Sequence, residues 1–280
     1  MAISAQDVKK LRDLTGAGMM DCKKALAEAN GDFDKAIEEL RKKGQKLSAK
    51  RADREANEGV VMALTSHNRN NGIVFKLGCE TDFVAKTESF VDLAKQIGEI
   101  ALQHLPESND ALLALPFDGD MTIAAKVEEQ VGVIGEKLEV SNYSKIETAA
   151  GEGQVIPYIH MGYRAGVIVA LNQEGPDLVD CGKDVAMQVA AMKPIAVDKA
   201  NVPQEVVDKE RESGKELARN EGKPEAILEK IAMGRLNKFF KETTLLNQVF
   251  VKNSKETIGS YLKSKHPELT VTDFKHISLS

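Results

Sequence analysis

The stretch Gly59-Val-Val-Met-Ala-Leu64, followed by Gly72-Ile-Val-Phe-Lys-Leu77, decides the fold because a similar pair of runs occurs further along the chain. The second pair is Gly153-Gln-Val-Ile-Pro-Tyr158 and Gly166-Val-Ile-Val-Ala-Leu171, and in each pair the two glycines are thirteen positions apart. Runs rich in β-branched residues with a polar, turn-rich segment between them are typical of a β-hairpin. The sequence therefore predicts two related hairpins.

An amphipathic helix is expected after each hairpin, over about residues 90–105 in the first half and 178–192 in the second. Two strands bury too little apolar surface alone, so each hairpin needs its helix on one face. We therefore predict an α+β protein with two related hairpin-plus-helix core subdomains, over residues 55–150 and 151–280, which share one sheet or pack against each other. A last strand is expected over residues 270–277.

The two halves differ in the connection between the second strand and the helix. Alignment of the copies leaves about six extra residues in the first half, within Cys79-Glu-Thr-Asp-Phe-Val-Ala-Lys86. A loop that only one copy has is not needed to close the subdomain. This segment is therefore a candidate for function.

Three short helices are expected within residues 1–40. Ser4 and Asp7 form a capping-box pattern at the start of the first helix, and Asp32 is a suitable N-cap for the third. The apolar side of the first helix is expected to consist of Val8, Leu11 and Leu14. With the basic segment that follows, this bundle forms the first predicted domain, residues 1–54.

Residues 41–54 carry seven lysine and arginine residues and no aromatic residue. One interpretation is a nucleic-acid-binding patch, and the other is a solvated helical linker. We favour the linker because no aromatic side chain is interleaved to stack on bases. The net charge of −5 also gives no general reason to expect direct nucleic-acid binding.

A further helical unit is expected over residues 202–241, inserted into the second subdomain. Two charged helices flank Gly222-Lys-Pro224, and this pattern is typical of an antiparallel helical hairpin. The expected apolar seam of the hairpin is thin and consists of Val206, Val207, Leu217, Ile227, Leu228, Ile231 and Leu236.

The common motifs of catalysis are missing: there is no GxxxxGK[ST] phosphate-binding loop, no HExxH and no GxSxG. Cys22, Cys79 and Cys181 lack the spacing of zinc ligands or of a disulfide framework and are expected to be reduced thiols. We therefore expect no metal, no cofactor and no enzymatic activity. Neither a run of about 20 apolar residues nor a secretion signal is present, so we expect a cytoplasmic protein without a membrane segment.

Two long motifs indicate a known family. Thr15-Gly-Ala-Gly-Met-Met-Asp-Cys-Lys-Lys-Ala-Leu26 closely resembles the first signature of the elongation factor Ts family, and the segment 79–86 resembles the second. The resemblance extends through Ala190-Ala-Met-Lys-Pro194 and Gly222-Lys-Pro224 to Val251. It implies a ubiquitin-associated-like N-terminal bundle, two core subdomains and an inserted helical hairpin, which agrees with the layout above.

The resemblance also implies a function: a translation elongation factor that acts as a guanine-nucleotide exchange factor on the GTPase elongation factor Tu. In the family, the segment that matches Thr81, Asp82, Phe83 and Val84 enters the partner's nucleotide domain and displaces its Mg²⁺, which promotes GDP release. An exposed aromatic ring suits this role, since it gains burial only when a partner opens a pocket. The alternative is that Phe83 caps its own core.

Contacts with elongation factor Tu are implied at two further places. Met19 and Met20, with Lys23, are either partner-facing or part of the bundle core, and the resemblance favours a partner contact for at least one methionine. His160 and Met161 lie in a turn similar to the family's His-Gly-Gly-Gly-Arg-Ile-Gly turn, but the turn departs from that pattern at three positions. A partner contact by His160 and a plain turn histidine therefore both remain open.

The resemblance leaves room for a homodimer or a 2:2 complex through the helical hairpin. The extra C-terminal helix of some family members is not expected here. Two other functions are considered: an adaptor that recruits a partner through residues 1–40 and leaves the core unexplained, and an RNA-binding protein that uses residues 41–54.

Overall fold

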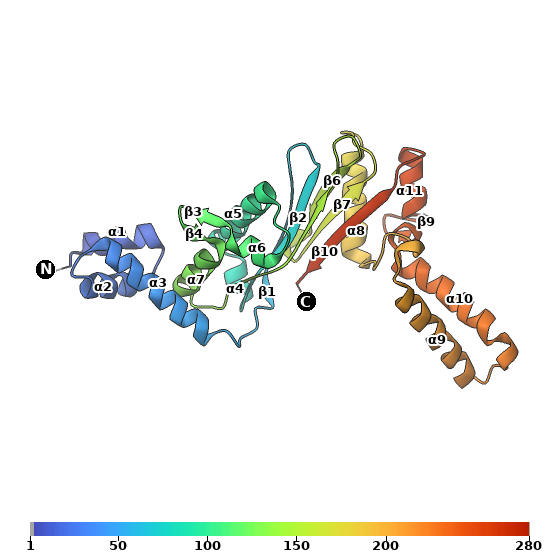
Figure 1. Cartoon of the computed structure of the whole chain (residues 1–280), viewed down its shortest axis with the longest axis horizontal. Helices are drawn as coiled ribbons and strands as arrows, with labels where there is room; N and C mark the ends of the chain where they lie inside the picture. The colour runs from blue at the N-terminus through green and yellow to red at the C-terminus, as the bar shows by residue number, and fades with distance from the viewer. Residues whose placement is uncertain (1–2, 280) are drawn as a thin grey trace.

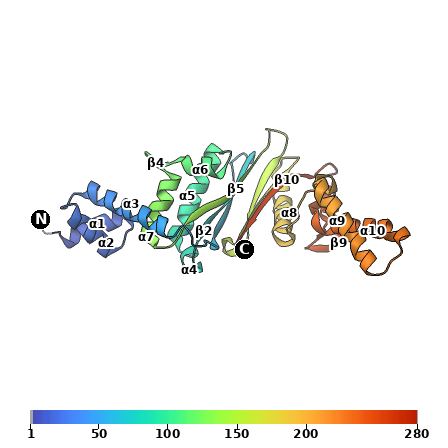
Figure 2. The same cartoon turned by 60° about the horizontal axis from the view of Figure 1, so that its bottom comes forward.

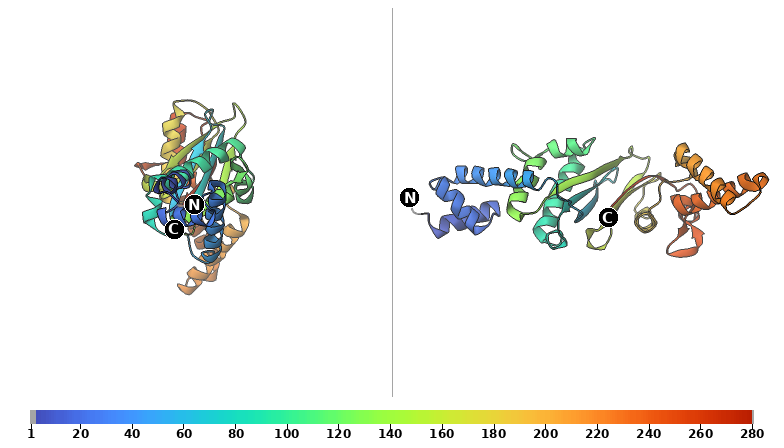
Figure 3. Two further views of the ribbon diagram at one scale, coloured as in Figure 1. Left: turned by 90° about the vertical axis from the view of Figure 1, so that its left-hand side faces the viewer. Right: turned by 90° about the horizontal axis from the view of Figure 1, so that it is seen from below.

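The chain extends along one long axis, with helices at both ends and two three-stranded β-sheets between them (Figure 1). The structure is a computed structural model and describes residues 3–279. Seen from below, the N-terminal helices and the helical hairpin lie at opposite ends of the molecule (Figure 3). The α+β class predicted from the sequence is confirmed.

The N-terminal bundle consists of α1 (Ala5–Thr15), α2 (Met19–Glu28) and α3 (Phe33–Lys50). The capping box is present at Ser4, and the Asp32 side chain caps α3. Leu14 is not part of the apolar side that was expected, because it lies in the last turn of α1 and is 64% exposed. The third helix is also longer than expected and continues through most of the basic segment.

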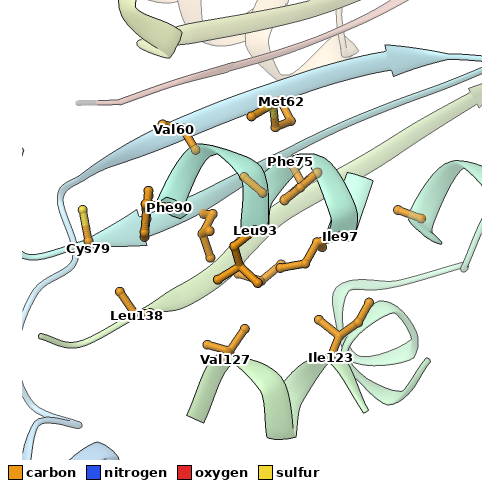
Figure 4. Packing of buried hydrophobic residues seen from close by; sticks show 14 of the residues in the cluster. Val60, Met62, Phe75, Cys79, Phe90, Leu93, Ile97, Ile123, Val127 and Leu138 are labelled. Carbon is orange, nitrogen blue, oxygen red and sulfur yellow. The ribbon is translucent and has the colours of Figure 1, made fainter. Parts of the chain in front are cut away.

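The first sheet has the antiparallel order β1-β2-β5, with β1 at Glu58–Thr65, β2 at Asn71–Cys79 and β5 at Glu139–Glu147. The sequence pattern did not predict β5. Helix α5 (Glu88–His104) covers the outer face of this sheet, and the cluster beneath it is shown in Figure 4. Between α5 and β5 the chain forms α6 (Asn109–Ala114), β3 (Pro116–Asp118), β4 (Met121–Thr122) and α7 (Ile123–Ile134).

The second sheet has the antiparallel order β10-β7-β6, with β6 at Gln154–Ile159, β7 at Ala165–Leu171 and β10 at Val271–Ser278. Helix α8 (Leu178–Met192) packs on β6 and β7, as α5 packs on β1 and β2. The remaining short elements of this half are η1 (Met161–Tyr163), η2 (Lys199–Asn201), η3 (Leu245–Asn247), β8 (Val249–Phe250), β9 (Asn253–Thr257) and α11 (Ile258–Lys265).

The two sheets pack face to face, so the order of layers is α5, first sheet, second sheet, α8. Glycines permit the close approach: a Cβ added at Gly72 would lie 2.5 Å from a methyl carbon of Val155, and one at Gly166 would lie 2.8 Å from Val61. Of the two arrangements considered from the sequence, packing of separate sheets is therefore the one found. The buried residues between the sheets are Val61, Ala63, Val74, Ile146, Val155, Ile168, Ala170, Ile277 and Leu279.

The helical hairpin consists of α9 (Gln204–Asn220) and α10 (Glu225–Thr243). Its seam differs from the expected one, because small residues allow the helices to approach closely. Gly214, Ala218 and Ala232 are buried together with Leu228 and Leu236. Leu217 and Ile227, assigned to the seam from the sequence, are instead 47% and 41% exposed.

Candidate functional site

The segment 79–86 forms a short helix, α4 (Asp82–Ala85), at the end of the first sheet. Helix α4 lies at the lower edge of the molecule in Figure 2, between β2 and α5 along the chain. Thr81 is its N-cap, and the Thr81 hydroxyl accepts a hydrogen bond from the backbone N–H of Val84. The extra residues of the first half therefore build a separate projecting turn.

The residues of this turn face different directions. Phe83 is 81% exposed, whereas Ala85 is buried and Val84 packs against the core of the first half. Asp82 forms an ion pair with Lys86, 2.5 Å away, and this hydrogen-bonded lysine holds the pKa of Asp82 below its ordinary value. Phe83 is therefore the apolar side chain that α4 presents outward, and the alternative in which it caps its own core is wrong.

The base of α4 is attached to the loop between α7 and β5. One carboxylate oxygen of Glu136 accepts hydrogen bonds from the backbone N–H groups of Glu80 and Thr81, at 3.1 and 3.0 Å. The other accepts one from the Thr81 hydroxyl at 2.6 Å. The Cys79 thiol donates to the Thr81 carbonyl oxygen at 3.1 Å. Burial, with the nearby Glu136 charge, raises the pKa of Cys79 to about 12, so it remains a protonated donor at neutral pH.

A reciprocal contact fixes the same two segments from the other side. The backbone N–H of Lys137 donates to Glu80 at 2.6 Å, and Arg51 and Arg54 donate to the same carboxylate at 2.6 and 3.1 Å. Desolvation opposes ionisation of Glu80, but these hydrogen bonds and charges outweigh it and lower the pKa of Glu80. The Glu80 carboxylate thus connects the end of α3, the base of α4 and the segment that leads into β5.

The turn that contains His160 and Met161 lies at the same end of the first sheet. Arg164 pairs with Glu58 at 3.3 Å, and Glu58 is the β1 residue opposite Cys79 in the ladder. Met161 is 86% exposed. His160 is exposed and hydrogen-bonds through Nδ1 to the Tyr158 hydroxyl at 3.0 Å. The fold therefore brings this turn and α4 to one edge of the molecule.

The methionines of the N-terminal bundle are surface residues and not part of its core. Met19 is 51% exposed and Met20 is 74% exposed, at the first turn of α2. Lys23, one turn later, is also exposed. Leu14, on the other side of the glycine turn, adds a further exposed apolar side chain that the sequence interpretation had placed inside. A bundle surface suited to a partner is therefore present.

The basic segment 41–54 has acidic neighbours from outside its own helix. Arg41 pairs with Glu129 at 3.6 Å, Lys43 with Asp21, and Arg51 with Glu80. One face of this helix is also packed: a Cβ added at Gly44 would lie 2.8 Å from the carbonyl oxygen of Glu128 in α7. The segment is thus helical as expected, but it is docked on the core and not simply solvated. This pairing gives no support to an RNA-binding surface.

The remaining groups considered from the sequence are the cysteines and candidate metal ligands. Cys22, Cys79 and Cys181 are buried free thiols. Over residues 3–279, no cluster of His, Cys, Asp and Glu side chains has the arrangement of a metal site. The same residues include no helix with the length and apolar character needed to cross a membrane.

Comparison with known proteins supplies the family. The family described as "Elongation factor TS" matches residues 80–280, which begins at the α4 segment. The chain belongs to the elongation factor Ts family. It is 51% identical over 278 residues to Elongation factor Ts of Amoebophilus asiaticus, with 99% of each chain covered. It is 50% identical to that of Cytophaga hutchinsonii, with 99% of each covered, and 47% identical to that of Flavobacterium psychrophilum, with 99% and 98% covered.

Membership of the elongation factor Ts family makes this chain a translation elongation factor and confirms the resemblance inferred from the two motifs. Sequence reasoning included Glu80 in the candidate segment 79–86 without giving it a role, and it missed Glu136 and Lys137. The reason is separation along the chain: more than 50 residues lie between Glu80 and Glu136, and no motif connects them. The one local signal is Gly135, whose φ of 83° ends α7 directly before Glu136.

Proposed function

We propose that this protein is a guanine-nucleotide exchange factor that binds elongation factor Tu in its GDP form and promotes GDP release by displacing Mg²⁺. The observation that carries the proposal is the outward Phe83 on α4, a turn present in only one of two related halves. An exposed ring on an anchored turn is suited to enter a pocket that opens in a partner. Thr81 and Val84 support the turn, whereas Asp82 and Phe83 are the contact residues.

Displacement of Mg²⁺ explains how a protein contact can release a nucleotide. A Mg²⁺ that bridges protein and phosphate oxygens contributes much of the affinity for GDP, and it requires a nearly ideal arrangement of ligands. Insertion of a side chain that shifts these ligands lowers the affinity for GDP without making or breaking a covalent bond. We therefore propose that the protein has no enzymatic activity and needs no cofactor of its own.

Release of fluorescent GDP from purified elongation factor Tu tests the proposal. Stopped-flow traces with increasing concentrations of this protein should show a release rate that rises to a plateau. Equal rates with and without the protein, over the whole concentration range, would overturn the exchange function. Salt-dependent binding of RNA in the same preparation would support the RNA-binding alternative instead.

A second measurement, made with Mg²⁺ chelated, tests whether displacement of the ion is the mechanism of release. Chelation of Mg²⁺ should speed spontaneous release, and the further acceleration by this protein should become smaller, because both act on the same ligand contacts. An acceleration factor that is unchanged by chelation would mean that the protein promotes release without displacing the ion.

Two further parts of the proposal concern assembly and location. Leu217, Ile227 and Met233 are exposed on the helical hairpin, which supports a contact between two copies in a homodimer or a 2:2 complex. Light scattering with and without elongation factor Tu tests this, and a monomer that forms a 1:1 complex would remove it. We further propose that the protein acts in the cytoplasm and makes no direct contact with nucleic acid.

A further inference from the structure

Helix α4 is too short to hold its own orientation. It contains four residues, Asp82–Ala85, whereas isolated helices below about 12 residues are marginal in water because nucleation is costly. Phe83 at 81% exposure gains almost no packing energy in the free protein. The direction in which the ring projects must therefore come from the packing of Val84 and Ala85 and from contacts at the base of the turn.

Glu136 supplies the contacts closest to that base. Its carboxylate accepts the N–H groups of Glu80 and Thr81 and the hydroxyl of Thr81. The β2–β5 ladder ends at the pair Gly78 and Glu139, so no backbone pairing reaches these N–H groups. The side chain of Glu136 thus continues the connection between the two segments beyond the end of the sheet.

We propose that Glu136 is a positioning residue for nucleotide exchange: its carboxylate holds the backbone at Glu80 and Thr81 so that Phe83 projects from the surface before the partner arrives. The inference rests on the proposed exchange function and adds a residue outside the α4 segment. In this role Glu136 acts through the backbone at Glu80 and Thr81.

The kinetic step that Glu136 affects follows from the arrangement of the other surfaces. Met20 on the bundle and Met161 on η1 are exposed, and the hydrogen bonds of Glu136 go to Glu80 and Thr81, so both methionines remain available for docking without it. The hydrogen bonds from Glu80 and Thr81 to Glu136 are called the anchor below. Loss of the anchor leaves the docking contacts intact, but the turn is then disordered and must become ordered when Phe83 enters the partner. The free energy needed to order the turn is therefore spent after docking. It lowers the rate of GDP release at saturation and does not change the concentration needed for half-saturation.

Two measurements on Glu136→Ala test the proposal. Hydrogen exchange in the free protein should become at least about tenfold faster at the amides of Glu80 and Thr81, because their acceptor is gone. GDP release at saturating protein should be about tenfold slower, while the half-saturating concentration stays within about twofold. Glu139→Ala is the matched control, since Glu139 is an exposed carboxylate three residues away that pairs with Lys137 and not with α4.

Two milder variants keep the test valid if Glu136→Ala does not fold. Glu136→Gln keeps one carbonyl oxygen for the backbone N–H groups and can donate to the Thr81 hydroxyl, so its release rate should lie between those of the parent and of Glu136→Ala. Thr81→Val removes only the 2.6 Å hydroxyl contact to Glu136 and the weak cap at Val84, and should give a smaller loss in the same direction.

The possible failures are distinguishable. Unchanged hydrogen exchange at Glu80 and Thr81 in Glu136→Ala would show that the anchor does not exist. If Glu136→Ala does not fold, parental release rates in both Glu136→Gln and Thr81→Val would overturn the inference. Faster exchange with a parental release rate would show that the anchor has no role in exchange, and the inference would be wrong. If the parent itself does not accelerate GDP release, the exchange function fails, and the hydrogen-exchange result still decides whether the anchor exists.

Discussion

A phenylalanine ring that is 81% exposed leaves apolar area in water that only a partner can cover. The neighbouring side chains do the opposite: Val84 packs on the core, and Thr81 turns toward Glu136. Asp82 keeps its charge through Lys86 and stays beside the ring. At the scale of single residues, the exposed apolar area of α4 is therefore concentrated in one side chain, and the support of that side chain is distributed over others.

Phe83→Ala should slow catalysed GDP release by more than about tenfold at saturating protein, because loss of a central aromatic side chain from an interface costs about 2 kcal/mol or more. The melting temperature should not change, since the ring is exposed in the free protein. Val251→Ala removes a 48% exposed apolar side chain from the other half and serves as the control. Release of fluorescent GDP is the measurement, and parental rates in Phe83→Ala would contradict the role of the ring. Asp82→Ala should show a smaller loss.

Glu80→Gln should destabilise the protein at neutral pH by about 1 kcal/mol, because it removes the charge that Arg51 and Arg54 face. The folded pKa of Glu80 is lowered, so this contribution is complete above the unfolded value of about 4.3 and is lost as the pH falls through the folded value. Urea unfolding should therefore show a difference in the free energy of unfolding between parent and variant, and this difference should disappear on acidification. A difference that is constant with pH, or an equal effect of Glu139→Gln, would refute this account.

At the scale of elements, the repeat allowed prediction of the hairpins and helices, including α8 over the residues expected, 178–192. Strand β5 was not predicted because its sequence lacks a clear alternation of apolar and polar residues. Its Asn142 has a φ of 57°, and the ladder to β2 shifts register between Val74 and Lys76. A bulged strand of mixed burial has no periodic signal in the sequence.

The docking of the basic helical segment on α7 was not predicted, for a different reason. Its contact with α7 is made by two glycines: a Cβ at Gly132 would lie 2.8 Å from the Cα of Gly44. Close approach of two backbones requires small residues and leaves no apolar stripe to recognise. The candidate site was predictable where a motif contains it, at Thr81 to Val84, and was not predictable where residues distant in the chain meet, at Glu80 and Glu136.

Gly44→Ala and Gly234→Ala should have opposite effects on stability. Both glycines lie within helices, where alanine is favoured by about 1 kcal/mol. At Gly234 nothing lies within 4 Å of an added Cβ, so the melting temperature should rise. At Gly44 the methyl group meets the backbone oxygen of Glu128 at 2.8 Å, so α3 must separate from α7. Faster proteolysis near residues 50–57 in Gly44→Ala, absent in Gly234→Ala, is the check; equal melting temperatures would contradict it.

At the scale of the whole molecule, candidate contacts lie on parts that are well separated along the long axis (Figure 1). The bundle presents Met19 and Met20 at one end, and α4 and η1 present Phe83 and Met161 at the edge of the sheets. Because α3 docks on α7 and Arg51 pairs with Glu80, the bundle is held against the core and not carried on a free linker. A partner that spans these surfaces meets them at fixed spacing, which lowers the entropic cost of binding.

Removal of residues 1–40 should weaken docking and leave the exchange step in place. The helical segment 41–50, its contact with α7 and the anchor at Glu136 all remain after the truncation. The half-saturating concentration in GDP release should therefore rise by about tenfold or more, while the plateau rate stays near that of the parent. This pattern is the reverse of that expected for Phe83→Ala, so the two variants serve as controls for each other.

Full-length Met19→Ser/Met20→Ser should reproduce part of the effect of truncation, since both methionines are exposed and their replacement leaves the bundle core intact. Circular dichroism and the melting temperature verify that the bundle is folded in this variant. If the truncated protein reached its plateau at the parental concentration, the bundle would have no docking role. If instead its plateau fell with the half-saturating concentration unchanged, the bundle would act in the exchange step itself, and the division of roles between bundle and core would be wrong.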